Sequence, residues 1–137
     1  MARTTLAALF LIGYAAAGDA FAGSPSDIQR SLETEARQSV PGFTGFSAQR
    51  GEHFFNARHG GNWSCATCHN SDPRQPGRHA ATGKVIAPLA PAANPDRFTN
   101  PARVEKWFGR NCNDVLQRPC TAAEKGDVLA WLLSLGR

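Results

Sequence analysis

The sequence predicts an all-α fold. Helix-start signals at Ser24, Ser47, Asn100 and Thr121 each precede a run in which apolar residues recur at helical spacing. No stretch alternates apolar and polar side chains as a half-buried strand would. Between the second and third of these runs, residues 60–100 are rich in proline and glycine, so we expect helices joined by one long loop region.

Residues 1–22 have the features of a secretory signal peptide. Arg3 precedes an apolar run over residues 6–17, and the small-x-small sequence Ala20-Phe21-Ala22 is typical of a cleavage site. We therefore expect export to the periplasm with cleavage after about Ala22, an uncleaved membrane anchor being the alternative.

The charge that would follow cleavage limits the classes of partner. Residues 23–137 carry 14 basic and 10 acidic side chains, a net charge of +4. The basic residues are scattered, without the Lys/Arg runs and interleaved aromatic residues that single-stranded nucleic acid requires. We expect no nucleic-acid binding and one small domain.

Residues 23–46 are predicted to form an N-terminal helix and a linker. Ser24 suits the N-cap, Pro25 the first helical position and Asp27 the third. One apolar stripe then follows at i, i+4 and i+8, made by Ile28, Leu32 and Ala36. Pro41-Gly42 ends this helix.

The second predicted helix begins with Ser47 as its cap. Gly51 is a poor helix former, and a glycine at such a position usually marks a place where another helix crosses closely. Phe55, one turn later, would pack at that crossing.

The sequence Cys65-Ala66-Thr67-Cys68-His69 places two thiols three positions apart with a histidine directly after the second. On a helical turn both thiols lie on one face, where they can bond to the two vinyl groups of one porphyrin. C-x-x-C-H is the attachment signature of haem c, and a histidine is the usual proximal iron ligand. We expect one covalent haem c, held by Cys65 and Cys68 with His69 as proximal ligand. The Pro-rich residues 60–100 would wrap around the haem edge.

Two other sites could use the same thiols. A zinc site would need Cys65, Cys68 and two further ligands such as His69 and His79, but this spacing matches no common zinc finger. A thioredoxin-like pair would require a surrounding βαβ pattern, which the Gly/Pro-rich context does not offer.

The last two predicted helices follow the loop region. Asn100-Pro101 provides an N-cap and first position for a helix with Val104, Trp107 and Phe108 on one side, and residues 110–113 are expected to follow that helix. Thr121 and Glu124 form a capping box for the final helix. This helix is the most apolar, with Val128, Leu129, Trp131, Leu132 and Leu135.

The distal side of the iron is the open question. Electron-carrier cytochromes commonly use a methionine sulfur there, but the single methionine is Met1, which leaves with the signal peptide. His53, His59 and His79 are candidates for a second imidazole, which would give a plain six-coordinate electron carrier. His53 belongs to the helix expected to cross the last one, and the other two lie close to the haem motif.

The remaining thiols, Cys112 and Cys120, are not followed by histidine, so they form no second haem site. In an exported protein two thiols this close in sequence are expected to form a disulfide. The disulfide would stabilise the fold, stiffen a loop that carries the distal ligand, or act as a redox switch.

The order of elements resembles the class I cytochrome c fold, with Gly51, Phe55 and Trp131 at the helix crossing. Longer segments resemble the sphaeroides haem protein (SHP) family, high-spin, oxygen-binding c-type cytochromes; they are residues 83–91, 95–99, 102–113 and 130–132. The likeness runs from about Ser47 to Leu135, so residues 47–137 are expected to be the cytochrome c domain.

The resemblance implies a distal ligand and partners. In that family the asparagine before the first disulfide cysteine binds ferric iron, which points to Asn111, with Asn113 as the nearby rival. An amide oxygen is a hard donor that suits Fe(III) better than Fe(II), so reduction would free the position for O2, NO or CO. The implied electron donors are a dihaem cytochrome c or a membrane cytochrome b. Whether bound O2 is reduced, as by a terminal oxidase, or only carried is left open.

Overall fold

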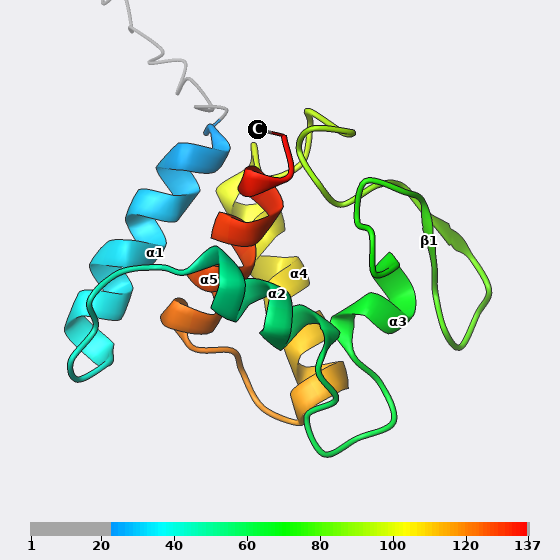
Figure 1. Cartoon of the computed structure of the whole chain (residues 1–137), viewed down its shortest axis with the longest axis horizontal. Helices are drawn as coiled ribbons and strands as arrows, with labels where there is room; N and C mark the ends of the chain where they lie inside the picture. Colours follow the sequence, from blue (N-terminus) through cyan, green and yellow to red (C-terminus); the bar gives the residue numbers. More distant parts are fainter. Residues whose placement is uncertain (1–22, 137) are drawn as a thin grey trace, which may run out of the picture.

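The computed structural model describes residues 23–136 (Figure 1). Its helices are α1 (Pro25–Ser39), α2 (Ala48–Asn56), α3 (Cys65–His69), α4 (Pro101–Leu116) and α5 (Ala122–Ser134), and between α3 and α4 lies a hairpin of strands β1 (Gly77–Arg78) and β2 (Val85–Ile86). The all-α prediction is confirmed apart from this hairpin. The predicted signal peptide lies outside the described residues. Within residues 23–136 no helix has the length and apolar character needed to cross a membrane.

The predicted caps begin the four longer helices. The Ser24 and Thr121 hydroxyls accept hydrogen bonds from the third backbone N–H of α1 and α5, and each helix completes a capping box. Ser47 accepts from Arg50 N at 3.2 Å, and the Asn100 side chain accepts from Arg103 N at 2.8 Å. These bonds satisfy backbone donors that have no partner inside their own helix, which is why each helix starts where it does.

Helix α5 is the centre of the molecule (Figure 1). On one side α1 packs against it, and Ile28 and Leu32 meet Leu129 in a buried cluster. On the other side α2 crosses it, and a second cluster forms from Phe55, Ala90, Val128, Trp131 and Leu132. Because both faces of α5 are covered, eight of its 13 residues are buried and none is fully exposed, as its apolar composition predicts.

The crossing of α2 over α5 requires glycine. A Cβ atom built on Gly51 would lie 2.0 Å from the Asp127 carbonyl oxygen and 2.9 Å from the Val128 nitrogen. No side chain fits there without moving one helix. One turn later the Phe55 ring packs on Trp131 with centroids 4.9 Å apart, which confirms the predicted crossing.

Asp127 also ties the two helices together by charge. Its buried carboxylate accepts hydrogen bonds from Ser47 N at 2.7 Å, Arg50 Nε at 2.7 Å and Arg50 Nη2 at 2.8 Å. The paired guanidinium compensates the burial of this charge, and the link fixes the start of α2 on α5.

The hairpin was not predicted from the sequence. Gly77 pairs with Ile86 and Arg78 with Val85, so each strand is only two residues long. Such strands are too short to show the alternation by which strands are recognised. Gly77 lies against α3, since a Cβ there would be 2.1 Å from the Cys68 carbonyl oxygen.

Helix α4 is longer than predicted. Residues 110–113, expected after the helix, lie inside it, and α4 continues to Leu116, with Gln117 as its C-cap at φ 59°. No proline interrupts residues 102–116, and Gly109 alone does not break the helix. The expectation that a loop carries Asn111 and Cys112 is therefore wrong.

Two links join α4 to α5. The predicted disulfide between Cys112 and Cys120 is confirmed, with Cα atoms 5.6 Å apart. The buried Lys125 ammonium forms an ion pair with Glu105 at 2.9 Å. The end of α4 that carries Asn111 is thus held to the central helix.

The replacement Gly51→Ala is expected to destabilise the protein by about 3 kcal/mol and to lower the melting temperature by about 10 °C, because the methyl group forces α2 and α5 apart. The control is Gly109→Ala in α4, where a Cβ meets no atom within 4 Å. This change should stabilise by about 0.7 kcal/mol through helix propensity. Equal effects of the two replacements in thermal unfolding would contradict the close crossing.

The double replacement of Cys112 and Cys120 by Ser is expected to cost about 2.5 kcal/mol, because the unfolded chain regains the entropy of a loop of about nine residues. A lower guanidinium midpoint is the measurement. A thiol reductant should lower the midpoint of the wild type and leave that of the double variant unchanged. An unchanged midpoint in the double variant would show that the disulfide does not stabilise the fold.

Candidate haem site

The predicted attachment motif forms α3. Ser64 caps this short helix, exchanging hydrogen bonds with Thr67 in a capping box, and Asn70 ends it with φ 68°. Cys65 and Cys68 are free thiols one turn apart, so they lie on the same side of α3. Burial raises the pKa of the Cys65 thiol to about 11, which keeps it protonated at neutral pH.

These cysteines do not resemble a zinc site. Within residues 23–136 no three His, Cys, Asp or Glu side chains gather as a metal site would require. The two thiols therefore suit covalent attachment better than metal binding.

His69, the last residue of α3, has its ring on the Phe55 side of the core, with ring centroids 6.3 Å apart. Burial, with a smaller contribution from the positive charge of Arg97, lowers the pKa of His69 to about 4. The imidazole is thus neutral at pH 7 and has a lone pair for a metal. Its Nδ1 atom is buried and has no hydrogen-bond partner among the described residues.

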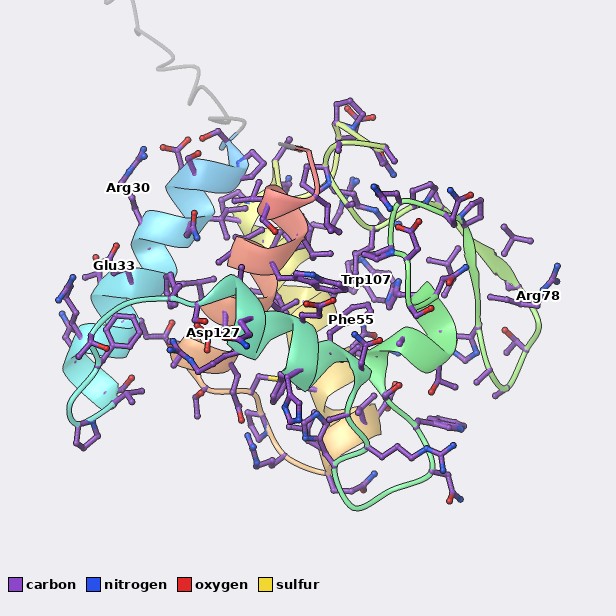
Figure 2. All side chains as sticks on the ribbon, viewed as in Figure 1. Arg30, Glu33, Phe55, Arg78, Trp107 and Asp127 are labelled. Carbon is purple, nitrogen blue, oxygen red and sulfur yellow. A yellow bond between two sulfur atoms is a disulfide. The ribbon has the colours of Figure 1, made fainter. Side chains whose placement is uncertain are left out.

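Large apolar side chains are exposed around this motif. Trp63, just before α3, is 38% exposed, Val85 of the hairpin 60%, and Trp107 of α4 44%. In Figure 2 Trp107 projects from α4 toward the side of the molecule on which α3 lies. Together with two free thiols and a neutral histidine, these exposed apolar side chains suit a porphyrin, which would cover them.

Asn111, the predicted distal ligand, lies on α4, one turn after Trp107 and on the same face. Its side chain is half-buried, and no hydrogen bond within residues 23–136 uses its amide. The rival Asn113 is exposed. The structure gathers Cys65, Cys68 and His69 on α3, whereas Asn111 comes from a different helix.

One contact places that end of α4 beside the motif. A Cβ on Gly61, four residues before Cys65, would lie 3.7 Å from the carbonyl oxygen of Val115, which is one turn beyond Asn111. Gly61, in the segment that leads into α3, therefore lies against the last turn of α4.

The three alternative histidine ligands have other surroundings. His53 is exposed on α2. His59 Nε2 lies 2.9 Å from the Phe54 carbonyl oxygen, and its ring packs on the Phe54 ring. His79 Nδ1 accepts hydrogen bonds from the backbone nitrogens of residues 81 and 82. These contacts engage one ring nitrogen of His59 and one of His79.

The structure adds Arg97, which the sequence analysis did not single out. Its Nε donates to the Pro88 carbonyl oxygen at 3.0 Å and its Nη2 to the Ala87 carbonyl oxygen at 2.8 Å. The guanidinium thus holds the loop that precedes α4. A single arginine in a Pro-rich loop forms no pattern by which this role can be found.

Two surface hollows lie away from the motif. One is bounded by residues 37–43 at the end of α1, and the other by residues 49–57 on α2. Each is lined by one short run of the chain, so neither has the walls that a cofactor cavity needs.

Comparisons with known proteins identify the family. A family model described as a domain of unknown function (DUF1924) matches residues 41–132. The cytochrome c-type protein SHP of Cereibacter sphaeroides is 49% identical over 120 residues, which cover 85% of this chain and 89% of the relative. Cytochrome c'' of Methylophilus methylotrophus is 38% identical over 103 residues, 72% of each chain.

Solved structures agree with these sequences. Oxidised SHP, described as an oxygen binding cytochrome c, superposes with a TM-score of 0.73 at 46% identity and covers 82% of this chain and 97% of its own. Oxidised cytochrome c'' gives 0.72 at 34% identity, covering 80% and 93%. The predicted cytochrome c-like fold and the predicted resemblance are both confirmed. The chain belongs to the SHP family of c-type cytochromes, and its cofactor is one covalently attached haem c.

Proposed function

We propose that this protein is an exported, high-spin monohaem cytochrome c that accepts single electrons and, once reduced, binds O2, NO or CO. Cys65 and Cys68 attach the haem, His69 is the proximal ligand, and Asn111 is a distal ligand of the oxidised iron only. The observation that carries the proposal is the half-buried Asn111 amide, which no hydrogen bond within residues 23–136 engages.

The proximal side follows from α3. When bound, the haem iron supplies a one-electron couple and a coordination position that a diatomic ligand can take. Burial against Phe55 keeps His69 neutral, the form in which imidazole binds iron. The covalent thioethers of Cys65 and Cys68 would retain the cofactor in either oxidation state.

The distal side follows from the chemistry of an amide. The Asn111 oxygen is a neutral, hard donor, so its hold weakens when the iron gains an electron. Asn111 would then give up this position to a small ligand. No methionine stands in residues 23–137 to close that position permanently.

A relative supports a ligand that leaves. The solution structure of cytochrome c'' from Methylophilus methylotrophus, with a TM-score of 0.72 and 33% identity, is described in terms of haem-ligand detachment. Oxygen binding is the described property of SHP. Both properties fit a weak distal donor in this chain.

We further propose that the electron donor is another c-type or b-type cytochrome in the periplasm. Residues 61–118, which contain the haem motif and α4, carry eight basic and four acidic side chains, so the basic surplus lies on the haem-bearing part. An acidic face on the donor would be attracted there. Residues 47–137 would form the cytochrome domain, and residues 23–46 an added helix and linker.

The replacement Cys65→Ala is expected to leave at most one covalent bond to the haem and to lower the yield of loaded protein at least tenfold, because a single thioether cannot fix the porphyrin over His69. Mass spectrometry of the exported protein measures covalent haem per chain. The exposed residue Thr67 provides a control, since Thr67→Ser changes the same turn without touching a thiol. Normal loading of Cys65→Ala would contradict attachment through this motif.

The replacement Asn111→Ala is expected to change the ferric absorption spectrum to that of an iron with water or no distal ligand, while CO affinity of the ferrous form changes less than threefold. Asn113→Ala, two residues away and exposed, is the matched control and should leave both forms unchanged. A ferric spectrum that is identical in Asn111→Ala and the wild type would exclude Asn111 as ligand. A histidine would then be the distal ligand, and the protein a plain electron carrier.

A further inference from the structure

Arg97 is a half-buried cation for which the described chain provides no anion. Within residues 23–136 no carboxylate forms an ion pair with it. Arginines elsewhere in the chain do find carboxylates: Arg50 pairs with Asp127, Arg74 with Asp72 and Arg118 with Glu124. Burial lowers the pKa of Arg97, and the nearby charge of Arg103 lowers it further, so its surroundings disfavour the charge.

The hydrogen bonds of Arg97 use one edge of its guanidinium group. Nε and Nη2 donate to the carbonyl oxygens of Pro88 and Ala87. A guanidinium has five N–H donors, so these bonds leave Nη1 without a protein acceptor in residues 23–136. Neutral carbonyls stabilise a buried cation only in part, and a charge removed from water generally requires a counter-charge.

The position of Arg97 relates it to the haem site. Phe98, directly after Arg97, packs against the buried cluster that contains Phe55, and Cys65 of α3 packs against the same cluster. The loop that carries Arg97 therefore lies against the same part of the core as the haem motif. Haem c carries two propionate groups, and a guanidinium matches a carboxylate with paired hydrogen bonds. The missing anion is then supplied by the cofactor.

We propose that Arg97 binds a haem propionate and, as a fixed positive charge near His69, raises the reduction potential of the iron. The proposal rests on haem attachment at α3 and is independent of Asn111. The competing role is purely structural, in which Arg97 only holds the loop at Ala87 and Pro88.

Two replacements separate the roles. Arg97→Gln removes the charge, whereas Arg97→Lys keeps the charge but loses the two-pronged hold on the carbonyl oxygens. If Arg97 compensates the charge of a propionate, the reduction potential of the iron depends on the charge at position 97. Arg97→Lys then keeps a potential close to that of the wild type, and Arg97→Gln does not. If Arg97 only holds the loop, both replacements lower the melting temperature, and the reduction potentials of the two variants do not differ from each other. Arg103→Gln removes an equal charge from an exposed neighbour and is the matched control.

Redox titration of the haem-loaded protein is the first measurement, after mass spectrometry has confirmed covalent haem in each variant. Arg97→Gln is expected to lower the ratio of reduced to oxidised protein at a fixed solution potential about tenfold, which is 59 mV for one electron. Arg97→Lys and Arg103→Gln should each change it less than threefold. Equal potentials in Arg97→Gln and the wild type, or equal losses in Gln and Lys, would overturn the proposal.

The infrared difference spectrum between oxidised and reduced protein is the second measurement. The carboxylate stretching band of the haem propionates should shift in Arg97→Gln and in Arg97→Lys, because neither side chain offers a guanidinium fork. If Arg97→Gln does not fold, the lysine variant still decides, since a band unchanged from the wild type would overturn propionate binding. CO binding and the ferric spectrum of the wild type test Asn111 separately. An unchanged propionate band would therefore count against Arg97 as the propionate partner but not against Asn111 as the ligand.

Discussion

The contact of Gly51 with the Asp127 carbonyl is the constraint on which the rest of the structure depends. Because no Cβ separates the two backbones, α2 lies close enough to α5 for Phe55 to reach Trp131. The same Phe55 ring lies beside His69, so the crossing that forms the core also buries the imidazole and keeps it neutral. The buried carboxylate of Asp127 fixes the same crossing by accepting hydrogen bonds from Arg50. The fold and the neutral state of His69, the proposed proximal ligand, thus depend on one helix pair.

The two sides of the proposed iron site are built differently. His69 belongs to a short helix that packs on the core, whereas Asn111 belongs to α4, which is tied to α5 by the Cys112–Cys120 disulfide and the Lys125–Glu105 ion pair. A strong ligand on the core side and a weak one on a separately held helix would let one ligand leave while the other keeps its place. The hard amide oxygen would make that exchange depend on oxidation state. Ligand binding would therefore require reduction first.

Much of this arrangement could be predicted from the sequence, because its causes are local. The caps Ser24, Ser47, Asn100 and Thr121 satisfy backbone groups of their own helices, so each is visible in a few residues. The hairpin could not be predicted, since two-residue strands show no periodicity. The true end of α4 could not be predicted either, because its C-cap is a left-handed Gln117, a position that no glycine marks in the sequence. The role of Arg97 depends on carbonyl oxygens nine and ten residues away, which no local pattern encodes.

Exchange of the distal ligand on reduction is the central claim, and the absorption spectrum of the wild-type protein tests it most directly. The spectrum is recorded for the oxidised protein, for the reduced protein, and for the reduced protein under CO. We expect high-spin bands in the reduced form and a large shift on addition of CO. Low-spin bands in the reduced protein that CO does not change would contradict the claim, because they require a strong ligand that stays bound, and the protein would then be a simple electron carrier.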